Sequence, residues 1–199
     1  KNAQTALIHA PRRAPQYISS VQPPLFRAST IIFENTNALF NRHWTDAYDY
    51  SYGTHGTPTT FTLGDQIAQI EGGQYCLLAP SGLSAINLVN SCFLSYGDEV
   101  WVADNIYGPN MEHLRNLEQR YGITVQVYNP IDATSFQPSE KAKLIWLEAA
   151  GSVTLEFPDL TALVKKAKAQ NILTALDNTW GAGLAFNAFD FGDEHLSID

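Results

Sequence analysis

Three apolar runs of the sequence are each followed by a side chain that could act on a ligand. Residues 172–176 read ILTAL and lead directly to Asp177, Glu148 follows another apolar run, and Tyr107 follows a third. In a parallel sheet, ligands bind at the carboxyl ends of the strands. A carboxylate there can hold a cationic group, and an aromatic ring can stack on a planar one. Two plainer interpretations stay open: Tyr107 as a packing residue and Glu148 as a solvated charge at the rim.

A serine and a glycine open the helix that we expect over residues 81–97. Ser81 or Gly82 lies at or near the N-cap, where free backbone N–H groups and the helix dipole attract an anion such as a phosphate. Gly82 would allow such a group to approach the backbone closely. Many helices begin with serine and glycine for capping alone, so this motif by itself does not distinguish a phosphate site from an ordinary cap.

The sequence lacks the motifs of several other ligand-binding classes. An acid after an apolar strand also occurs in P-loop NTPases, but no G-x-x-x-x-G-K-[ST] loop is present, and no G-x-G-x-x-G follows an expected strand. The five histidines are scattered without an H-x-x-x-H or C-x-x-C spacing, so no metal site is predicted. A phosphate site, an aromatic face and an acid at a neighbouring strand end together fit pyridoxal 5′-phosphate (PLP), whose pyridine nitrogen needs a carboxylate to stay protonated.

The elements that must position these residues alternate along the chain. Apolar periodicity and Gly punctuation predict helices over 62–73, 81–97, 109–122 and 159–171, and strands over 74–80, 98–104, 123–129, 142–149 and 172–178. We therefore predict an α/β fold with a mainly parallel sheet flanked by helices. A short helix is expected over 35–44. The proline-rich start is expected to be extended, so that residues 1–58 form an N-terminal arm and inter-subunit segment and residues 59–199 the α/β domain.

Composition narrows the function classes further. The 199 residues are 45% hydrophobic with a net charge of -8, which favours a packed domain and argues against a nucleic-acid surface. No apolar run reaches the length of a membrane span, and the N-terminus lacks the apolar core of a secretory signal. Cys76 and Cys92 both stand in apolar stretches and are interpreted as buried free thiols of a reducing compartment. We therefore expect a cytoplasmic protein without nucleic-acid or membrane partners.

Stretches along almost the whole sequence resemble the Cys/Met-metabolism family of fold-type I PLP-dependent enzymes. They read TALIHAPRR (5–13), VQPPLFRASTIIF (21–33), YGTHGTPTT (52–60), IEGG (70–73), PSGLSAI (80–86), DNIYGPN (104–110) and DNTWGAG (177–183). The resemblance implies that residues 59–199 form part of the family's large PLP-binding domain. Within the family, LEAAGSVTLEF (147–157) and the Trp-Gly-Ala-Gly after DNT are most similar to the bacterial β-lyases that cleave cystathionine.

The resemblance also implies roles for the matching residues. Asp177 would bind the pyridinium nitrogen, and Tyr107 would stack on the ring and help with proton handling at the substrate. Phosphate contacts would come from the opening of one helix and from a neighbouring subunit, and two further residues would line the pocket. These sets are Ser81, Gly82 and Leu83 with the other subunit's Tyr52, and Asn178 with Trp180. The smallest active unit would be a homodimer, and a homotetramer is the alternative.

Two features depart from the pattern of the family. An arginine usually stands two residues after the tyrosine, where this sequence has Thr54, so phosphate binding would rely more on backbone donors or on a basic group elsewhere, such as the adjacent His55. The lysine that holds the cofactor is expected a few residues beyond 195–199. Lys165, Lys166 and Lys168 lie on an expected surface helix and are not candidates for that role. The sequence therefore corresponds to about the N-terminal half of such an enzyme, and this chain alone is expected to be inactive.

The activity that the resemblance implies is cleavage of a carbon–sulfur bond. The substrate would be cystathionine or a similar cysteine thioether, and the products a thiol such as homocysteine, pyruvate and ammonia. Three alternatives stay open: γ-elimination or γ-replacement at the same site, lysis of other cysteine conjugates, and a non-catalytic binding or assembly module.

Overall fold

A computed structural model of the chain describes residues 5, 22–43, 50–191 and 195–198. Its contacts divide the chain after Leu78 into two compact units, 1–78 and 79–199. Each unit is described by itself.

The described part of the first unit contains the helices α2 (Thr36–Phe40) and α3 (Pro58–Glu71). Thr57 caps α3 in a reciprocal capping box with Thr60, and Gly72 ends the helix in the left-handed conformation with φ of 76°. The strand predicted over 74–80 is wrong: these residues adopt no regular structure, and Tyr75 and Leu77 are about three-quarters exposed. An apolar run forms a strand only where a neighbouring strand pairs with it, and among the described residues none does so.

The second unit carries a five-stranded parallel sheet in the order β2-β1-β3-β4-β5, so the predicted α/β fold with a parallel sheet is confirmed. The strands are β1 (Glu99–Ala103), β2 (Thr124–Tyr128), β3 (Ala142–Glu148), β4 (Leu173–Asp177) and β5 (His195–Ile198). The helices are α4 (Gly82–Phe93), α5 (Gly108–Tyr121) and α6 (Leu160–Lys168), with short 3-10 turns at Ala133–Ser135 and Ala188–Phe191.

The strand order contains a point where the direction of winding reverses. From β1 the chain passes through α5 to β2 on one side, whereas from β3 it passes through α6 to β4 on the other. Because such crossovers are right-handed, α5 and α6 cover opposite faces of the sheet. Reversal at neighbouring strands leaves a crevice between the carboxyl ends of β1 and β3, which is the usual ligand position in open α/β sheets.

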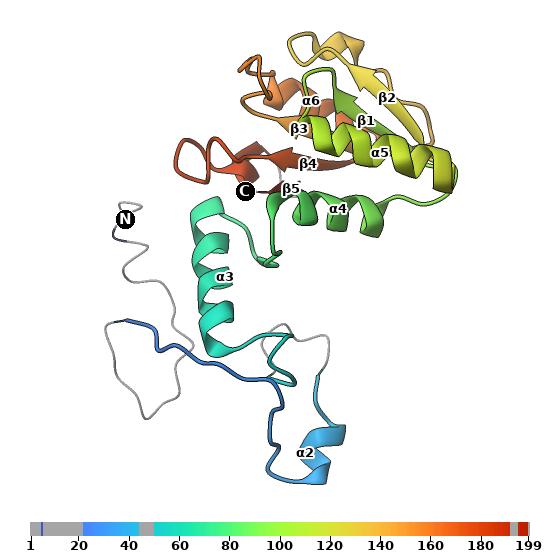
Figure 1. The fold of residues 1–199 in the computed structure, drawn as a ribbon. Helices are drawn as coiled ribbons and strands as arrows, with labels where there is room; N and C mark the ends of the chain where they lie inside the picture. Colours follow the sequence, from blue (N-terminus) through green and yellow to red (C-terminus); the bar gives the residue numbers. More distant parts are fainter. Residues whose placement is uncertain (1–4, 6–21, 44–49, 192–194, 199) are drawn as a thin grey trace. The chain divides into compact units, whose positions relative to one another are not determined.

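Helices α4 and α5 lie side by side along one face of the sheet (Figure 1). The fully buried Asn90 of α4 joins them to the sheet: its amide donates to Asn110 of α5 at 3.1 Å and accepts from the Trp146 indole of β3 at 2.8 Å. Asn90 lies late in α4 and Asn110 lies early in α5, so α4 begins about 9 Å further toward the carboxyl edge than α5 does. The polar pair thus fixes the position of α4 along α5.

Three smaller expectations have outcomes here. Neither cysteine forms a disulfide, as predicted, but the expectation that both are buried is wrong, because Cys92 is exposed and Cys76 only partly buried. Cys92 lies on the outward side of α4, so its apolar sequence neighbours did not report its own burial. Lys165 and Lys168 are exposed as predicted, whereas Lys166 is partly buried. Within the described part of the chain, no helix has the length and apolar character needed to cross a membrane.

Candidate functional site

Two carboxylates stand next to each other at the carboxyl edge of the sheet. Glu148 ends β3 and Asp177 ends β4, and the two residues are partners in the strand register. Glu148 is 4% exposed, which excludes the interpretation of this residue as a solvated rim charge. Asp177 is partly buried.

The environment of Glu148 favours its protonated form. Burial raises the pKa of the Glu148 carboxyl, hydrogen bonds from Ser152 and from the Tyr107 backbone lower it, and the charge of Asp177 raises it again, with a net rise. A buried carboxylate with a raised pKa beside a second carboxylate is typical of functional sites, although structural networks produce it too.

Asp177 is held in one orientation by its own turn. Its Oδ1 accepts from the Thr179 backbone N–H at 3.1 Å and from the Thr179 hydroxyl at 2.6 Å. Among the described residues none donates a hydrogen bond to Oδ2. One carboxylate oxygen is therefore fixed, and the other is available to a ligand. The sequence contains the threonine, but its role in orienting Asp177 is visible only in the structure.

Tyr107 lies on the other side of the crevice between β1 and β3. It is the N-cap residue of α5, its side chain is 38% exposed, and its backbone N–H donates to Glu148 Oε2 at 2.7 Å. A packing tyrosine would be buried, so the exposed ring is compatible with the stacking role that the sequence predicts.

A second link crosses the same crevice and was not predicted from the sequence. The Asn105 amide nitrogen, from the turn after β1, donates to the Thr154 hydroxyl at 2.8 Å and to Glu156 at 3.2 Å, both in the loop after β3. Gly151 lies beside it, and a Cβ there would lie 2.2 Å from the Asn105 side-chain nitrogen, so a larger residue would displace this amide. Asn105 precedes Tyr107 by two residues in a motif already noted, but nothing in the sequence indicates its partner.

The serine–glycine turn forms the start of α4. Ser81 is the N-cap, and its side chain accepts from the Ser84 backbone N–H at 3.1 Å. The backbone N–H groups of Gly82 and Leu83 fall in the first turn, where a helix offers no internal acceptors. Ser81, Gly82 and Leu83 are all exposed, and a Cβ added at Gly82 would meet nothing within 4 Å. The space beside these donors is therefore open to an anion.

The remaining predicted residues are distributed over both units. Asn178 is fully buried, and its backbone carbonyl accepts from Gly181 and Ala182 in the turn that follows β4. Trp180, in that same turn, is 68% exposed. Tyr52 belongs to the first unit, where it is 44% exposed and pairs with Thr30 in an antiparallel bridge.

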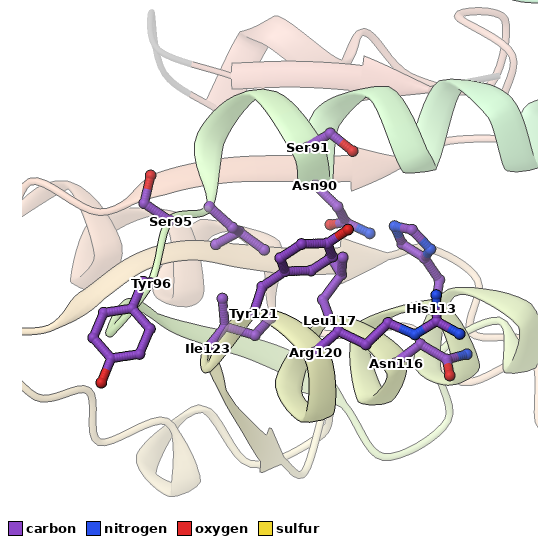
Figure 2. A pocket seen from close by; sticks show the side chains of 11 residues that line it. Asn90, Ser91, Ser95, Tyr96, His113, Asn116, Leu117, Arg120, Tyr121 and Ile123 are labelled. Atoms are coloured by element: carbon purple, nitrogen blue, oxygen red, sulfur yellow. The ribbon is translucent and has the colours of Figure 1, made fainter.

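A cavity of about 700 Å³ lies away from this edge, between the ends of α4 and α5 where the chain turns back toward the amino edge of the sheet. Figure 2 shows the side chains of His113, Leu117 and Tyr121 projecting from α5 toward α4. We call this cavity the α4–α5 groove. It contains none of the predicted site residues.

The residues at the carboxyl edge fit PLP in kind. An open first turn with free N–H donors suits a phosphate, and an exposed aromatic ring suits the pyridine face. A partly buried carboxylate whose Oδ2 accepts no hydrogen bond from the described residues suits a protonated ring nitrogen. The described residues contain no group of three or more His, Cys, Asp or Glu side chains placed to hold a metal ion. The fold is that of an α/β protein whose winding reverses between β1 and β3, and these groups lie at the carboxyl edge of its sheet.

The chain belongs to the family of Cys/Met metabolism PLP-dependent enzymes. The sequence profile of that family matches residues 4–196, which is nearly the whole chain. The cofactor of this family is PLP, which agrees with the cofactor that the sequence predicts.

Individual relatives agree on the family and differ in their reactions. The cystathionine β-lyase of Haemophilus influenzae is 34% identical over 203 residues, an alignment that covers 98% of this chain and 50% of that protein. An L-alanine/L-glutamate racemase of Wolbachia pipientis is 33% identical over 199 residues, an alignment that covers 95% of this chain and 49% of that protein. The chain thus spans about half the length of the curated relatives it matches.

Solved structures support the fold. A cystathionine γ-lyase from Lactobacillus plantarum, crystallised with L-serine, superposes with a TM-score of 0.79 at 26% identity and covers 89% of this chain and 45% of that one. The predicted class, the PLP-binding α/β domain of fold-type I enzymes, is confirmed by this likeness.

Proposed function

We propose that the protein carrying this chain is a PLP-dependent carbon–sulfur β-lyase that cleaves cystathionine, or a similar cysteine thioether, to a thiol, pyruvate and ammonia. The observation that carries this proposal is the carboxyl edge of the sheet, where Asp177, Tyr107 and the start of α4 offer the groups that PLP needs. The β-lyase reaction in particular is supported by several relatives of that name at 30–34% identity.

PLP supplies an electron sink for the charge that develops at the substrate α-carbon. Asp177 would keep the ring nitrogen protonated through Oδ2, while Thr179 keeps Oδ1 in place. A carboxylate that is already oriented needs no reorganisation when charge develops, and this is why such groups contribute strongly to catalysis.

The other predicted residues would bind and orient. The N–H groups of Gly82 and Leu83, with the Ser81 hydroxyl, would hold the phosphate, and Tyr107 would stack on the ring and help to move the α-proton. Asn178 and Trp180 would line the pocket. Tyr52 would reach the phosphate in a neighbouring subunit of a cytoplasmic homodimer or homotetramer.

A second function is favoured by one observation, the similarity to the Wolbachia racemase. A racemase removes an α-proton and returns it from the other side without breaking a bond at the β-carbon. It would need the same charge on Asp177, so this residue does not distinguish the two reactions. A γ-lyase would need it as well.

Product analysis with the complete protein separates these reactions. We expect pyruvate from cystathionine, no 2-oxobutyrate, and no D-alanine from L-alanine. Formation of 2-oxobutyrate would replace the proposal with γ-elimination, and D-alanine without pyruvate would replace it with racemisation. Asp177→Asn serves as the matched control, since it should suppress whichever product arises from PLP chemistry.

A further inference from the structure

Glu148 has no role in the function proposed above, yet it contacts Tyr107 and lies beside Asp177, which both have proposed roles. It is nearly fully buried, it lies beside Asp177 in the strand register, and its Oε2 accepts the Tyr107 backbone N–H at 2.7 Å. Two residues 41 positions apart in sequence are thereby joined across the crevice between β1 and β3. A buried charge is costly unless its oxygens are bonded, so its presence here needs an explanation.

The start of α5 depends on this contact. Tyr107 is the N-cap residue, but its own side chain makes no capping hydrogen bond. A carboxylate at the N-terminus of a helix is favoured by the helix dipole. Glu148 therefore supplies from β3 the hydrogen-bond acceptor that α5 lacks in its own sequence.

We propose that Glu148 is a positioning residue, which fixes the Tyr107 ring relative to Asp177 by binding the Tyr107 backbone N–H across the crevice. It acts through Tyr107 and need not touch the cofactor. The second link, from Asn105 to the loop after β3, holds the two loops together without contacting Tyr107. Of the two links, only the Glu148 contact involves Tyr107, the residue whose ring would stack on PLP. This inference rests on the proposed role of Tyr107 in stacking on PLP.

A matched pair of variants isolates the acceptor. Glu148→Gln and Glu148→Met are both uncharged and of similar length, but only glutamine keeps an oxygen that can accept the N–H. In the complete protein, hydrogen exchange at the Tyr107 amide should quicken about tenfold in Glu148→Met and stay near the original rate in Glu148→Gln. Equal exchange in the methionine variant and the original protein would overturn the inference.

The second readout follows the cofactor itself. The visible circular dichroism of bound PLP depends on how the ring is held, so Glu148→Met should lower it to about half or less, whereas Glu148→Gln should keep most of it. Loss of the band to the same extent in both variants would show that the charge of Glu148 matters rather than the contact, and would also overturn the inference. No PLP band in the unsubstituted protein would instead overturn the proposed function.

A double-substitution cycle separates positioning from a general loss of structure. If Glu148 acts through Tyr107, the effect of Glu148→Met on the PLP band should largely disappear when Tyr107 is already replaced by leucine. Additive effects would contradict the inference. Should the methionine variant fail to fold, Glu148→Asp, which keeps the charge but is one methylene shorter, replaces it in the same measurements.

Discussion

The carboxyl edge of the sheet and the α4–α5 groove lie toward opposite ends of the same two helices, and they differ in what their side chains can do. The groove has the cavity, about 700 Å³, and is lined by polar and apolar side chains that include Tyr96, Arg120 and Tyr121 but no carboxylate. The edge has Glu148 and Asp177 side by side and two hydrogen-bonded links across the crevice. In this unit, therefore, the acidic side chains meet at the strand ends, where backbone geometry brings distant residues together, and the cavity lies elsewhere.

The strongest test of this contrast replaces one acid at each end of the sheet. Asp177→Asn should lower kcat of the complete protein by about 100-fold or more, because the ring nitrogen loses the negative partner that stabilises developing charge. Asp98→Asn is the matched control: this aspartate precedes β1, and among the described residues its side chain accepts a hydrogen bond only from the nearby Ser95 backbone. Steady-state kinetics with cystathionine measure both, and a near-normal kcat in Asp177→Asn would contradict the proposed role.

The next test separates capping from phosphate binding. Ser81→Ala should lower the free energy of unfolding by about 1 kcal/mol, as loss of an N-cap usually does, and should also weaken PLP binding. Asp159 is the N-cap of α6, and its side chain accepts a hydrogen bond from the Ala162 N–H at 3.0 Å. Asp159→Ala removes this cap at a helix that carries no predicted site residue. It should cost similar stability and leave PLP affinity unchanged. Equal PLP affinity in the two variants would mean that Ser81 is only a cap.

The two regions should also respond to pH in opposite directions. The pKa of Glu148 is raised, chiefly by burial, so its ionisation opposes folding. The contribution of Glu148 to the free energy of unfolding is fully present below its unfolded pKa of 4.5 and is lost as the pH rises through its folded pKa. Glu148→Gln should therefore make the PLP-free protein more stable at pH 7, with a gain that shrinks toward pH 4.5. Urea unfolding across this range tests the sign, with the exposed Glu156→Gln as control.

His113 in the groove should make the free energy of unfolding depend on pH in the opposite direction and to a smaller extent. Burial lowers the pKa of His113, and its Nε2 has no hydrogen-bond partner among the described residues. The folded chain resists protonation there, so stability is present above the unfolded value of 6.5 and is lost as the pH falls toward the folded pKa. His113→Gln should flatten the decline below pH 6.5 in the same urea measurements. An unchanged slope would show that His113 does not contribute.

Local signals were sufficient for most of the individual elements. Gly72 and Gly122 end α3 and α5 in the left-handed conformation, as their positions in the sequence predict, and Ser81 caps α4. The strands after α4 were also found close to their predicted ranges, since their apolar runs are bounded by clear turn residues. The same reasoning failed over 74–80, where an apolar run lacks a pairing neighbour among the described residues.

The sequence by itself determined the family, the cofactor class and the residues that follow each strand, because these depend on residue types at short spacing. Only the tertiary structure decided that Glu148 is buried, that it lies beside Asp177 and that it binds the Tyr107 backbone. Strand order is the physical reason. Residues far apart in the chain meet only when parallel strands are placed next to each other, and no local pattern states which strand will be the neighbour.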